Sequence, residues 1–154
     1  IKIFDYVKEN IYKWCDPYDL FALGLPTCPF RKPLHVKECI TMSIKSSKSI
    51  FSACEYDFHV PFAFSTVYEN KTISGWHSPF KDTPLLTGNT RSQDQIKYFH
   101  PNGAIYVMKP NSISRETKTF YENSIPYIMT RDESIDIDNK EDLEFAELYL
   151  KRWS

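Results

Sequence analysis

Two aspartates near the end of the chain carry the most pointed chemical signal in the sequence. Asp136 and Asp138 alternate with isoleucines in the segment SIDIDNKED, residues 134–142. If this segment is a strand, both carboxylates lie on one side while Ile135 and Ile137 point into the core. Such a pair favours a divalent cation, and Mg²⁺ prefers a few carboxylates completed by substrate phosphates. The spacing also allows two solvated strand-end residues that act as helix-dipole partners.

A second polar cluster, NTRSQDQ at residues 89–95, suits an acidic ligand rich in hydroxyl groups. Arg91 offers a planar fork that matches a carboxylate or phosphate, and Gln93 can both donate and accept hydrogen bonds. Further along, Asn102-Gly103 opens an apolar, strand-like segment. This dipeptide indicates either a turn or a backbone that comes close to a ligand. A polar surface loop followed by a simple turn explains the same residues.

A third candidate is the loop PTCPFR, residues 26–31. Thr27 and Cys28 could present backbone amides and a hydroxyl to a ligand, with Arg31 nearby as an anion partner. A helix N-terminus surrounded by prolines is the plainer interpretation. The four histidines are at no metal-ligand spacing, and the four glycines are isolated, so no glycine-rich phosphate loop is present in the sequence.

Hydrophobic periodicity predicts the elements that position these residues. The first half of the chain is predicted to contain a helix over 2–14, a strand over 18–25, a helix from Pro33 to about 46, a strand over 49–57 and a hairpin over 63–76. The second half is predicted to contain a strand over 103–109, a short helical turn over 110–115, a strand over 125–130 and a closing helix capped by Asn139 and Asp142. The first strand, helix and second strand form a βαβ unit, whose strands should be parallel and whose crossover should be right-handed. Ligands bind at the C-terminal ends of such strands, which places PTCPFR at the functional edge.

Composition sets broad limits on the partners. The chain has 154 residues, a net charge of −1 and 42% hydrophobic residues, so we expect one domain and no nucleic-acid partner. No apolar segment approaches the roughly 20 residues that span a bilayer. With no signal-peptide pattern and no paired-cysteine motif, we expect a cytoplasmic protein with reduced thiols and no membrane partner. The chain begins at Ile1 without methionine, as a fragment or a processed product would.

Four segments, taken in order, resemble the acylneuraminate cytidylyltransferase family, the CMP-N-acetylneuraminic acid synthetases and their relatives. They are LPTCPFR (25–31), TRSQD (90–94), YFHPNGAIYV (98–107) and SIDIDNKEDLEFAE (134–147). The resemblance implies an α/β, Rossmann-like nucleotide-diphospho-sugar transferase fold with three layers and a mixed sheet. This chain would be its C-terminal portion, without the N-terminal βα nucleotide-binding unit.

The resemblance also implies an enzyme that joins CTP and a nine-carbon, sialic-type (nonulosonic) acid to give CMP-sugar and pyrophosphate, with Mg²⁺ as cofactor. It matches Asp136 and Asp138 to the magnesium pair, and Arg91 and Gln93 to positions that recognise the sugar acid. The expected substrate-binding residues are Arg91, Gln93, Asn102, Gly103 and Thr27, and the expected catalytic and metal-binding residues are Asp136 and Asp138. Asn102-Gly103 would form the close-packed floor of the sugar-acid side.

The predicted hairpin around 60–76 resembles the dimerisation element of the family, so we expect residues 1–154 to form one domain within a homodimer. Phe62, Phe64, Tyr68 and Trp76 would gather on or near this hairpin. They could form a small satellite core or a partner surface, and the sequence supports both.

Several residues depart from the family pattern and change what we expect of CTP binding, activity and the sugar substrate. The basic, glycine-rich CTP loop is absent here, so residues 1–154 alone should bind CTP poorly and be inactive. Leu25 and Cys28 replace the glutamine and serine common in the family. Ser92 replaces a second arginine, which favours a modified bacterial sugar such as pseudaminic or legionaminic acid. The alternative is a non-catalytic dimerising or sugar-acid-binding remnant, and coding sequence upstream of Ile1 would separate the two.

Overall fold

The computed structural model describes residues 20–69, 72–109 and 120–151. The chain divides into two compact units, residues 1–54 with 101–154 and residues 55–100. The predicted helix over 2–14 and the predicted helical turn over 110–115 lie outside the described residues. Among the described residues, no helix is long and apolar enough to cross a membrane.

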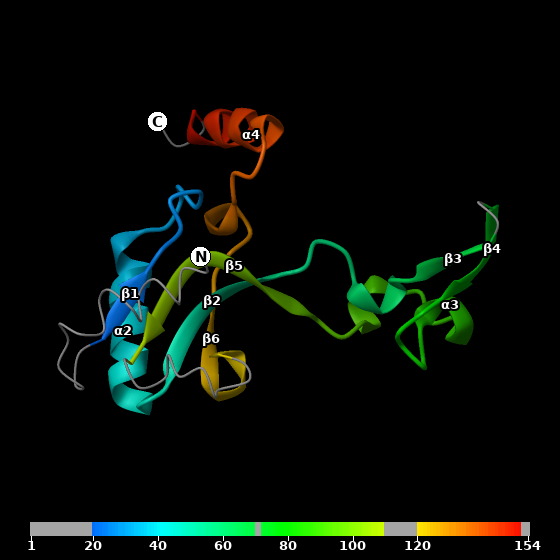
Figure 1. The fold of residues 1–154 in the computed structure, drawn as a ribbon, viewed down its shortest axis with the longest axis horizontal. Coiled ribbons are helices and arrows are strands. Elements are labelled where there is room, and N and C mark those ends of the chain that lie inside the picture. The colour runs from blue at the N-terminus through cyan, green and yellow to red at the C-terminus, as the bar shows by residue number, and fades with distance from the viewer. Residues whose placement is uncertain (1–19, 70–71, 110–119, 152–154) are drawn as a thin grey trace. The chain divides into compact units, whose positions relative to one another are not determined.

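A mixed sheet forms the centre of the first unit, with the strand order β1-β5-β2-β6. The strands are β1 (Phe21–Leu23), β2 (Ser49–Glu55), β5 (Phe99–Met108) and β6 (Ser124–Ile128). β1 is antiparallel to β5, and β2 is parallel to β6. β5 also runs opposite to β2 (Figure 1). The predicted α/β class with a mixed sheet is therefore confirmed.

The first predicted strand differs from the expectation. β1 covers only Phe21–Leu23 and lies at the edge of the described sheet, where its residues are half-buried or exposed. β5 lies between β1 and β2, so these two strands run in the same direction but do not pair. A local apolar pattern cannot reveal that a strand far along the chain will insert between two early ones. The first strand is therefore shorter than the predicted 18–25, and it does not pair with the second strand of the predicted βαβ unit.

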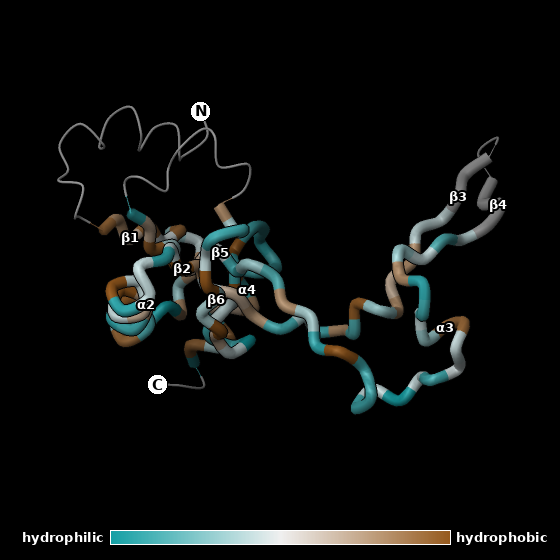
Figure 2. Tube along the Cα trace, turned by 90° about the horizontal axis from the view of Figure 1, so that it is seen from below, coloured by the Kyte–Doolittle hydropathy of each residue, from teal (hydrophilic) through white to brown (hydrophobic). Residues whose placement is uncertain are grey.

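The helix α2 (Pro33–Ser46) begins at the proline that the sequence predicted. Its buried residues, His35, Cys39 and Ser43, recur every four positions and so share one face. Val36 and Ile40 flank that face and pack against the core, whereas Leu34 and Ile44 are exposed. The tube of α2 accordingly shows both hydrophobic and hydrophilic bands (Figure 2).

The core of the first unit is formed by α2 and the sheet. Cys39 of α2 is fully buried with the strand residues Ile50, Ile105 and Val107. Cys28, in the loop after β1, belongs to the same cluster. Burial raises the pKa of the Cys39 thiol to about 12, so this cysteine is a neutral packing residue at physiological pH.

The helix α4 (Lys140–Leu150) begins with the predicted capping box. Asn139 Oδ1 accepts a hydrogen bond from the Asp142 amide at 2.9 Å, and Asp142 Oδ2 accepts one from the Asn139 amide at 3.0 Å. Of its apolar residues, only Ala146 is buried, while Leu143, Phe145, Leu148 and Leu150 are exposed.

The second unit contains the predicted hairpin, formed by β3 (Ser65–Glu69) and β4 (Thr72–His77). It also contains α3 (Pro84–Thr87) and a 3₁₀ turn over Ser92–Asp94. The rings of Phe64 and Trp76 pack edge to face with centroids 6.0 Å apart, yet each side chain remains about half exposed.

Candidate functional site

The loop after β1 is fastened to β5 by Arg31. Its guanidinium Nη1 donates to the Leu25 carbonyl at 3.1 Å and to the Ala104 carbonyl at 2.7 Å. The Leu25 amide in turn donates to the Gly103 carbonyl at 3.3 Å. Gly24 makes room for the guanidinium, because a Cβ there would lie 2.3 Å from Arg31 Nη1. Arg31 therefore binds backbone carbonyls of this unit, whereas the sequence suggested that it would bind an anionic ligand.

Asn102 and Gly103 lie inside β5 and do not form a turn before it, which corrects one of the two interpretations of this dipeptide. Gly103 has φ of 73°, the left-handed conformation that glycine permits at low cost. A Cβ on Gly103 would lie 2.7 Å from Leu25 Cδ1, so the strand and the loop approach each other closely here. Gly103 is therefore closely packed against the loop after β1, and its approach to a ligand stays a prediction.

The acidic segment is an extended connection to α4 and not the predicted strand. A 3₁₀ turn over Asp132–Ser134 comes before it, and residues 135–138 have no strand partner among the described residues. The Ile137 amide donates to the Thr27 carbonyl at 2.9 Å and so ties the segment to the loop after β1. The alternation of isoleucines and aspartates predicted a strand here, but alternation cannot supply a neighbouring edge.

Cys28, in the loop after β1, lies close to both β5 and the acidic segment that contains Asp136. Its Sγ lies 3.4 Å from the Asn102 carbonyl oxygen and 3.6 Å from Asp136 Oδ1, so the single S–H can donate to either acceptor. Burial, followed by the nearby Asp136 carboxylate, raises the pKa of this thiol to about 11. The thiol is therefore protonated at neutral pH and serves as a donor beside Asp136.

Four of the seven predicted site residues are thus brought together in the first unit. They are Thr27, Asn102, Gly103 and Asp136, and they are linked through Cys28 and the backbone contact of Ile137. The sequence suggested that Cys28 could offer a backbone amide to a ligand and that it replaces a serine common in the family, but it did not suggest a role for the thiol. The signal that it has a role was its position directly after Thr27, in a loop already expected at the functional edge.

Asp138 is placed differently from Asp136. It is exposed, and its amide donates to Asp142 Oδ2 at 3.0 Å, so the capping box of α4 also holds the backbone of this aspartate. Asp136 is half-buried beside Cys28. The two carboxylates therefore stand on a segment that is anchored at one end by the loop after β1 and at the other by α4.

The donor chemistry of this segment fits magnesium. Hard cations such as Mg²⁺ take oxygen ligands, and Mg²⁺ in nucleotide sites uses one or two carboxylates together with substrate phosphates and water. Among the described residues, no group of three or more His, Cys, Asp or Glu side chains forms a self-contained metal site. Two carboxylates would leave the other coordination positions to water and substrate oxygens, as in a substrate-bridged ion.

Arg91 and Gln93 lie in the second unit, on the 3₁₀ turn over Ser92–Asp94 and the residue before it. Arg91 Nε is 3.8 Å from Asp94 Oδ2. With the Gln93 amide turned to satisfy its hydrogen bonds, its oxygen accepts from Arg91 Nε at 3.1 Å and Nη2 at 2.5 Å. The predicted pair is therefore in direct contact, and Arg91 is 71% exposed, which leaves its guanidinium accessible to an anionic ligand.

The backbone of this loop is held by its own hydrogen bonds. Gln95 Nε2 donates to the Asn89 carbonyl at 2.7 Å and to the Arg91 carbonyl at 3.2 Å. The Asp94 amide also donates to the Arg91 carbonyl, at 3.1 Å. Since Gln95 braces the chain on both sides of Arg91, the guanidinium is presented on a preformed turn.

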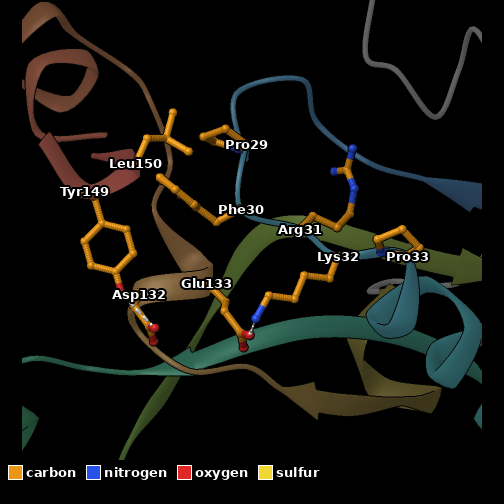
Figure 3. Close-up of a pocket in the computed structure, with 9 residues that line it drawn as sticks. All are labelled: Pro29, Phe30, Arg31, Lys32, Pro33, Asp132, Glu133, Tyr149 and Leu150. Carbon is orange, nitrogen blue, oxygen red and sulfur yellow. Dashed lines mark hydrogen bonds and ion pairs between the residues drawn. The ribbon is translucent and has the colours of Figure 1, made fainter. Parts of the chain in front are cut away.

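A pocket of about 260 Å³ lies beside the loop after β1 (Figure 3). Its lining residues are Pro29, Phe30, Arg31, Lys32, Pro33, Asp132, Glu133, Tyr149 and Leu150. The Tyr149 hydroxyl donates to Asp132 Oδ2 at 2.7 Å, and Lys32 Nζ pairs with Glu133 Oε1 at 2.5 Å. Thr27, Arg91, Gln93, Asn102, Gly103, Asp136 and Asp138 do not line this pocket. Its Lys32 and Glu133 pair with each other, and its Arg31 donates to backbone carbonyls, so the pocket belongs to the packing of α4 against the loop.

Comparison with known proteins supports the resemblance. No protein-family model matches the chain. The N-acylneuraminate cytidylyltransferase of Escherichia coli O18:K1:H7 is 29% identical over 145 residues, which are 93% of this chain and 32% of that protein. The pseudaminic acid cytidylyltransferase of Campylobacter jejuni is 27% identical over 135 residues, 87% of this chain and 55% of that protein.

A third relative agrees with these two. The N-acylneuraminate cytidylyltransferase of Streptococcus agalactiae serotype V is 26% identical over 140 residues, 90% of this chain and 32% of that protein. The chain thus spans about a third to about half of the length of these relatives. The predicted resemblance is confirmed: nearly the whole chain is similar to part of the N-acylneuraminate and pseudaminic acid cytidylyltransferases.

Proposed function

We propose that residues 1–154 supply the metal and sugar-acid side of a cytidylyltransferase that joins CTP and a nonulosonic acid to give CMP-sugar and pyrophosphate. The observation that carries this proposal is the convergence on Cys28 of the loop after β1, the strand β5 and the Asp136 segment. The Cys28 thiol lies within reach of the Asn102 carbonyl of β5 and of the Asp136 carboxylate, and so joins three segments that are far apart in the sequence. They meet at the edge where α/β sheets bind ligands. The similarity to cytidylyltransferases gives this arrangement its chemistry.

In the proposed reaction, the anomeric hydroxyl of the sugar acid attacks the α-phosphorus of CTP. A bond forms between the anomeric oxygen and phosphorus, the bond to the β-phosphate oxygen breaks, and pyrophosphate leaves as the hydroxyl loses its proton. Asp136 and Asp138 would hold Mg²⁺, which when bound neutralises phosphate charge. Positioning and electrostatics do most of the catalysis in such transfers.

Arg91 and Gln93 are proposed to orient the sugar acid. A guanidinium matches a carboxylate with two parallel hydrogen bonds, while the Gln93 amide that now contacts Arg91 can turn toward ligand hydroxyl or amide groups. Ser92 beside them leaves one positive charge fewer than a second arginine would. The proposed substrate class is nonulosonic acids, with modified bacterial members such as pseudaminic acid favoured.

CTP recognition is proposed to need residues beyond 1–154. The glycines of this sequence are isolated from one another, and glycine-rich loops are what commonly cradle nucleotide phosphates. Residues 1–154 alone should therefore show no turnover. The remnant hypothesis differs here, because a non-catalytic binding protein would retain sugar-acid affinity with no CTP-dependent chemistry in its full-length form.

A homodimer through the hairpin is part of the proposal. The half-exposed rings of Phe64 and Trp76 near the strand ends support a partner surface, since such aromatic residues are enriched in interfaces. The cytoplasmic location and the single-domain organisation stay predictions.

Replacing Arg91 tests the sugar-acid assignment. In the full-length gene product, we expect Arg91→Ala to raise KM for the sugar acid by roughly ten- to a hundredfold, because a hydrogen bond to a charged group contributes about 1.5–3 kcal/mol. The KM for CTP should not change. Steady-state pyrophosphate release, with each substrate varied in turn, measures both constants.

Arg91→Lys and Lys97→Ala are the matched variants. Lysine keeps the charge but loses the planar fork, so Arg91→Lys should recover only part of the affinity. Lys97 pairs with Glu55 at 2.9 Å on the surface of the same unit, and its removal should leave both KM values unchanged. Equal rises in the two KM values on Arg91→Ala would contradict a sugar-acid role.

A further inference from the structure

Asn102 is a buried amide whose side chain is used entirely within the protein. Only 5% of its surface is exposed. Its Oδ1 accepts from the Ala104 amide at 3.2 Å, and its Nδ2 donates to Ser134 Oγ at 2.7 Å and lies 3.5 Å from Met129 Sδ. Both amide hydrogens therefore have internal acceptors, and a ligand would have to displace one of them.

Ser134 is the residue of the acidic segment that the Asn102 side chain contacts. Its hydroxyl accepts from Asn102 Nδ2 and donates to the Thr130 carbonyl at 2.6 Å, while its amide donates to the Arg131 carbonyl at 3.1 Å. Ser134 ends the 3₁₀ turn that comes just before Asp136. Asn102 thus fixes the point from which the extended segment leaves.

A second connection runs through Cys28. The backbone carbonyl of Asn102 and Asp136 Oδ1 are the two alternative acceptors of the Cys28 thiol, at 3.4 Å and 3.6 Å from its Sγ. Asn102 consequently touches the acidic segment through its side chain and, by way of Cys28, through its main chain. The left-handed backbone of Gly103, φ 73°, lies directly after it and belongs to the same local geometry of β5.

We propose that Asn102 is a positioning residue that acts through Ser134 to hold Asp136 for the metal, rather than a residue that binds the sugar acid. This inference rests on the proposed function of the Asp136 segment. Under this proposal, removal of the Asn102 side chain should weaken metal binding and lower kcat. The KM for the sugar acid should not change. Outer residues that orient metal ligands typically contribute about 10–100-fold in metal affinity or activity.

Substitutions of Ser134 test the proposal with the smallest change, because they remove or keep a single hydroxyl group that Asn102 contacts. In the full-length gene product, Ser134→Ala should weaken the binding of Mn²⁺, used alone as the probe and followed by electron paramagnetic resonance, by roughly tenfold or more. Ser134→Thr keeps the hydroxyl and should restore affinity close to that of the wild type. Equal Mn²⁺ affinity in wild type and Ser134→Ala would overturn the proposal.

Asn102→Ala completes a double-mutant cycle with Ser134→Ala. If both residues act along one connection, the double variant should bind Mn²⁺ about as weakly as the worse single variant, whereas independent sites would give additive losses. Circular dichroism checks that each variant folds, and the Ser134 pair still decides the matter if Asn102→Ala does not. A raised KM for the sugar acid with unchanged Mn²⁺ affinity in Asn102→Ala would also overturn the proposal.

Asp136→Asn separates this inference from the proposed function. If Asp136→Asn loses Mn²⁺ affinity while the Asn102 and Ser134 variants keep it, the metal assignment stands and the positioning role fails. If Asp136→Asn binds Mn²⁺ as the wild type does, the metal assignment itself fails, and the positioning role fails with it.

Discussion

Replacing Asp136 and Asp138 together by asparagine is expected to lower cytidylyl transfer in the full-length gene product by at least about a hundredfold. Asparagine preserves size but removes both charges, and a bound metal contributes several kcal/mol of charge stabilisation to the transition state. Asp136→Asn alone should retain an acceptor for the Cys28 thiol, so the fold around it should persist. Pyrophosphate release at saturating CTP and sugar acid measures the loss.

A nearby acidic residue supplies the control for this experiment. Glu144 is exposed on α4 and makes a surface pair with Lys140, at 3.5 Å. Pairs of this kind contribute little, so Glu144→Gln should leave the rate unchanged. Full activity in the Asp136→Asn, Asp138→Asn double variant would refute the metal assignment, whatever the behaviour of the control.

Gly103→Ala is expected to destabilise the first unit by about 2–4 kcal/mol. The residue must adopt φ of 73°, which strains any non-glycine residue, and its new Cβ would meet Leu25 Cδ1 at 2.7 Å. Leu25 is half-buried and packs against the core, so relief of this contact would require its side chain to shift. Amide hydrogen exchange of β5 reports this change in the unit where it arises.

Gly88→Ala isolates the contact from the backbone strain. Gly88 has φ of 76°, but a Cβ added there would meet no atom within 4 Å, so alanine should cost only about 1 kcal/mol, measured from the amides around α3. The additional loss of unfolding free energy in Gly103→Ala, compared with Gly88→Ala, measures the contact of residue 103 with Leu25. Equal effects of the two substitutions would show that this close approach does not matter for stability.

Local patterns predicted those elements whose signals are local. Pro33 marked the start of α2, and the Asn139 and Asp142 pair marked the start of α4, because capping and first-turn preferences depend on neighbouring residues. The strands β2 and β6 and the hairpin β3–β4 were likewise found near their predicted positions.

The errors concern strand pairing, which depends on distant residues. Asn102-Gly103 has the composition of a turn, yet the strand continues through it because Leu25 and Arg31 hold its backbone groups from another part of the chain. The Asp136 segment alternates like a strand, but the Thr27 carbonyl ties it to a loop and not to the edge of a sheet.

Residue types suggest a chemistry for the site, whereas its geometry depends on contacts between distant residues. Carboxylates for magnesium and a guanidinium for an acid follow from residue type, so Asp136 and Arg91 could be proposed from the sequence. The connections of Asn102 to Ser134 and of Cys28 to Asp136 could not, since they join residues 32 and 108 positions apart. Such contacts become visible only once the sheet order is known.

Phosphorus NMR of the full-length gene product with CTP, Mg²⁺ and a panel of nonulosonic acids tests the central claim most directly. The account predicts that, with at least one of these acids, a CMP-sugar phosphodiester signal and pyrophosphate appear in equal amounts, and that neither appears without the acid. A protein that binds CTP and these acids but forms no CMP-sugar with any of them would contradict it.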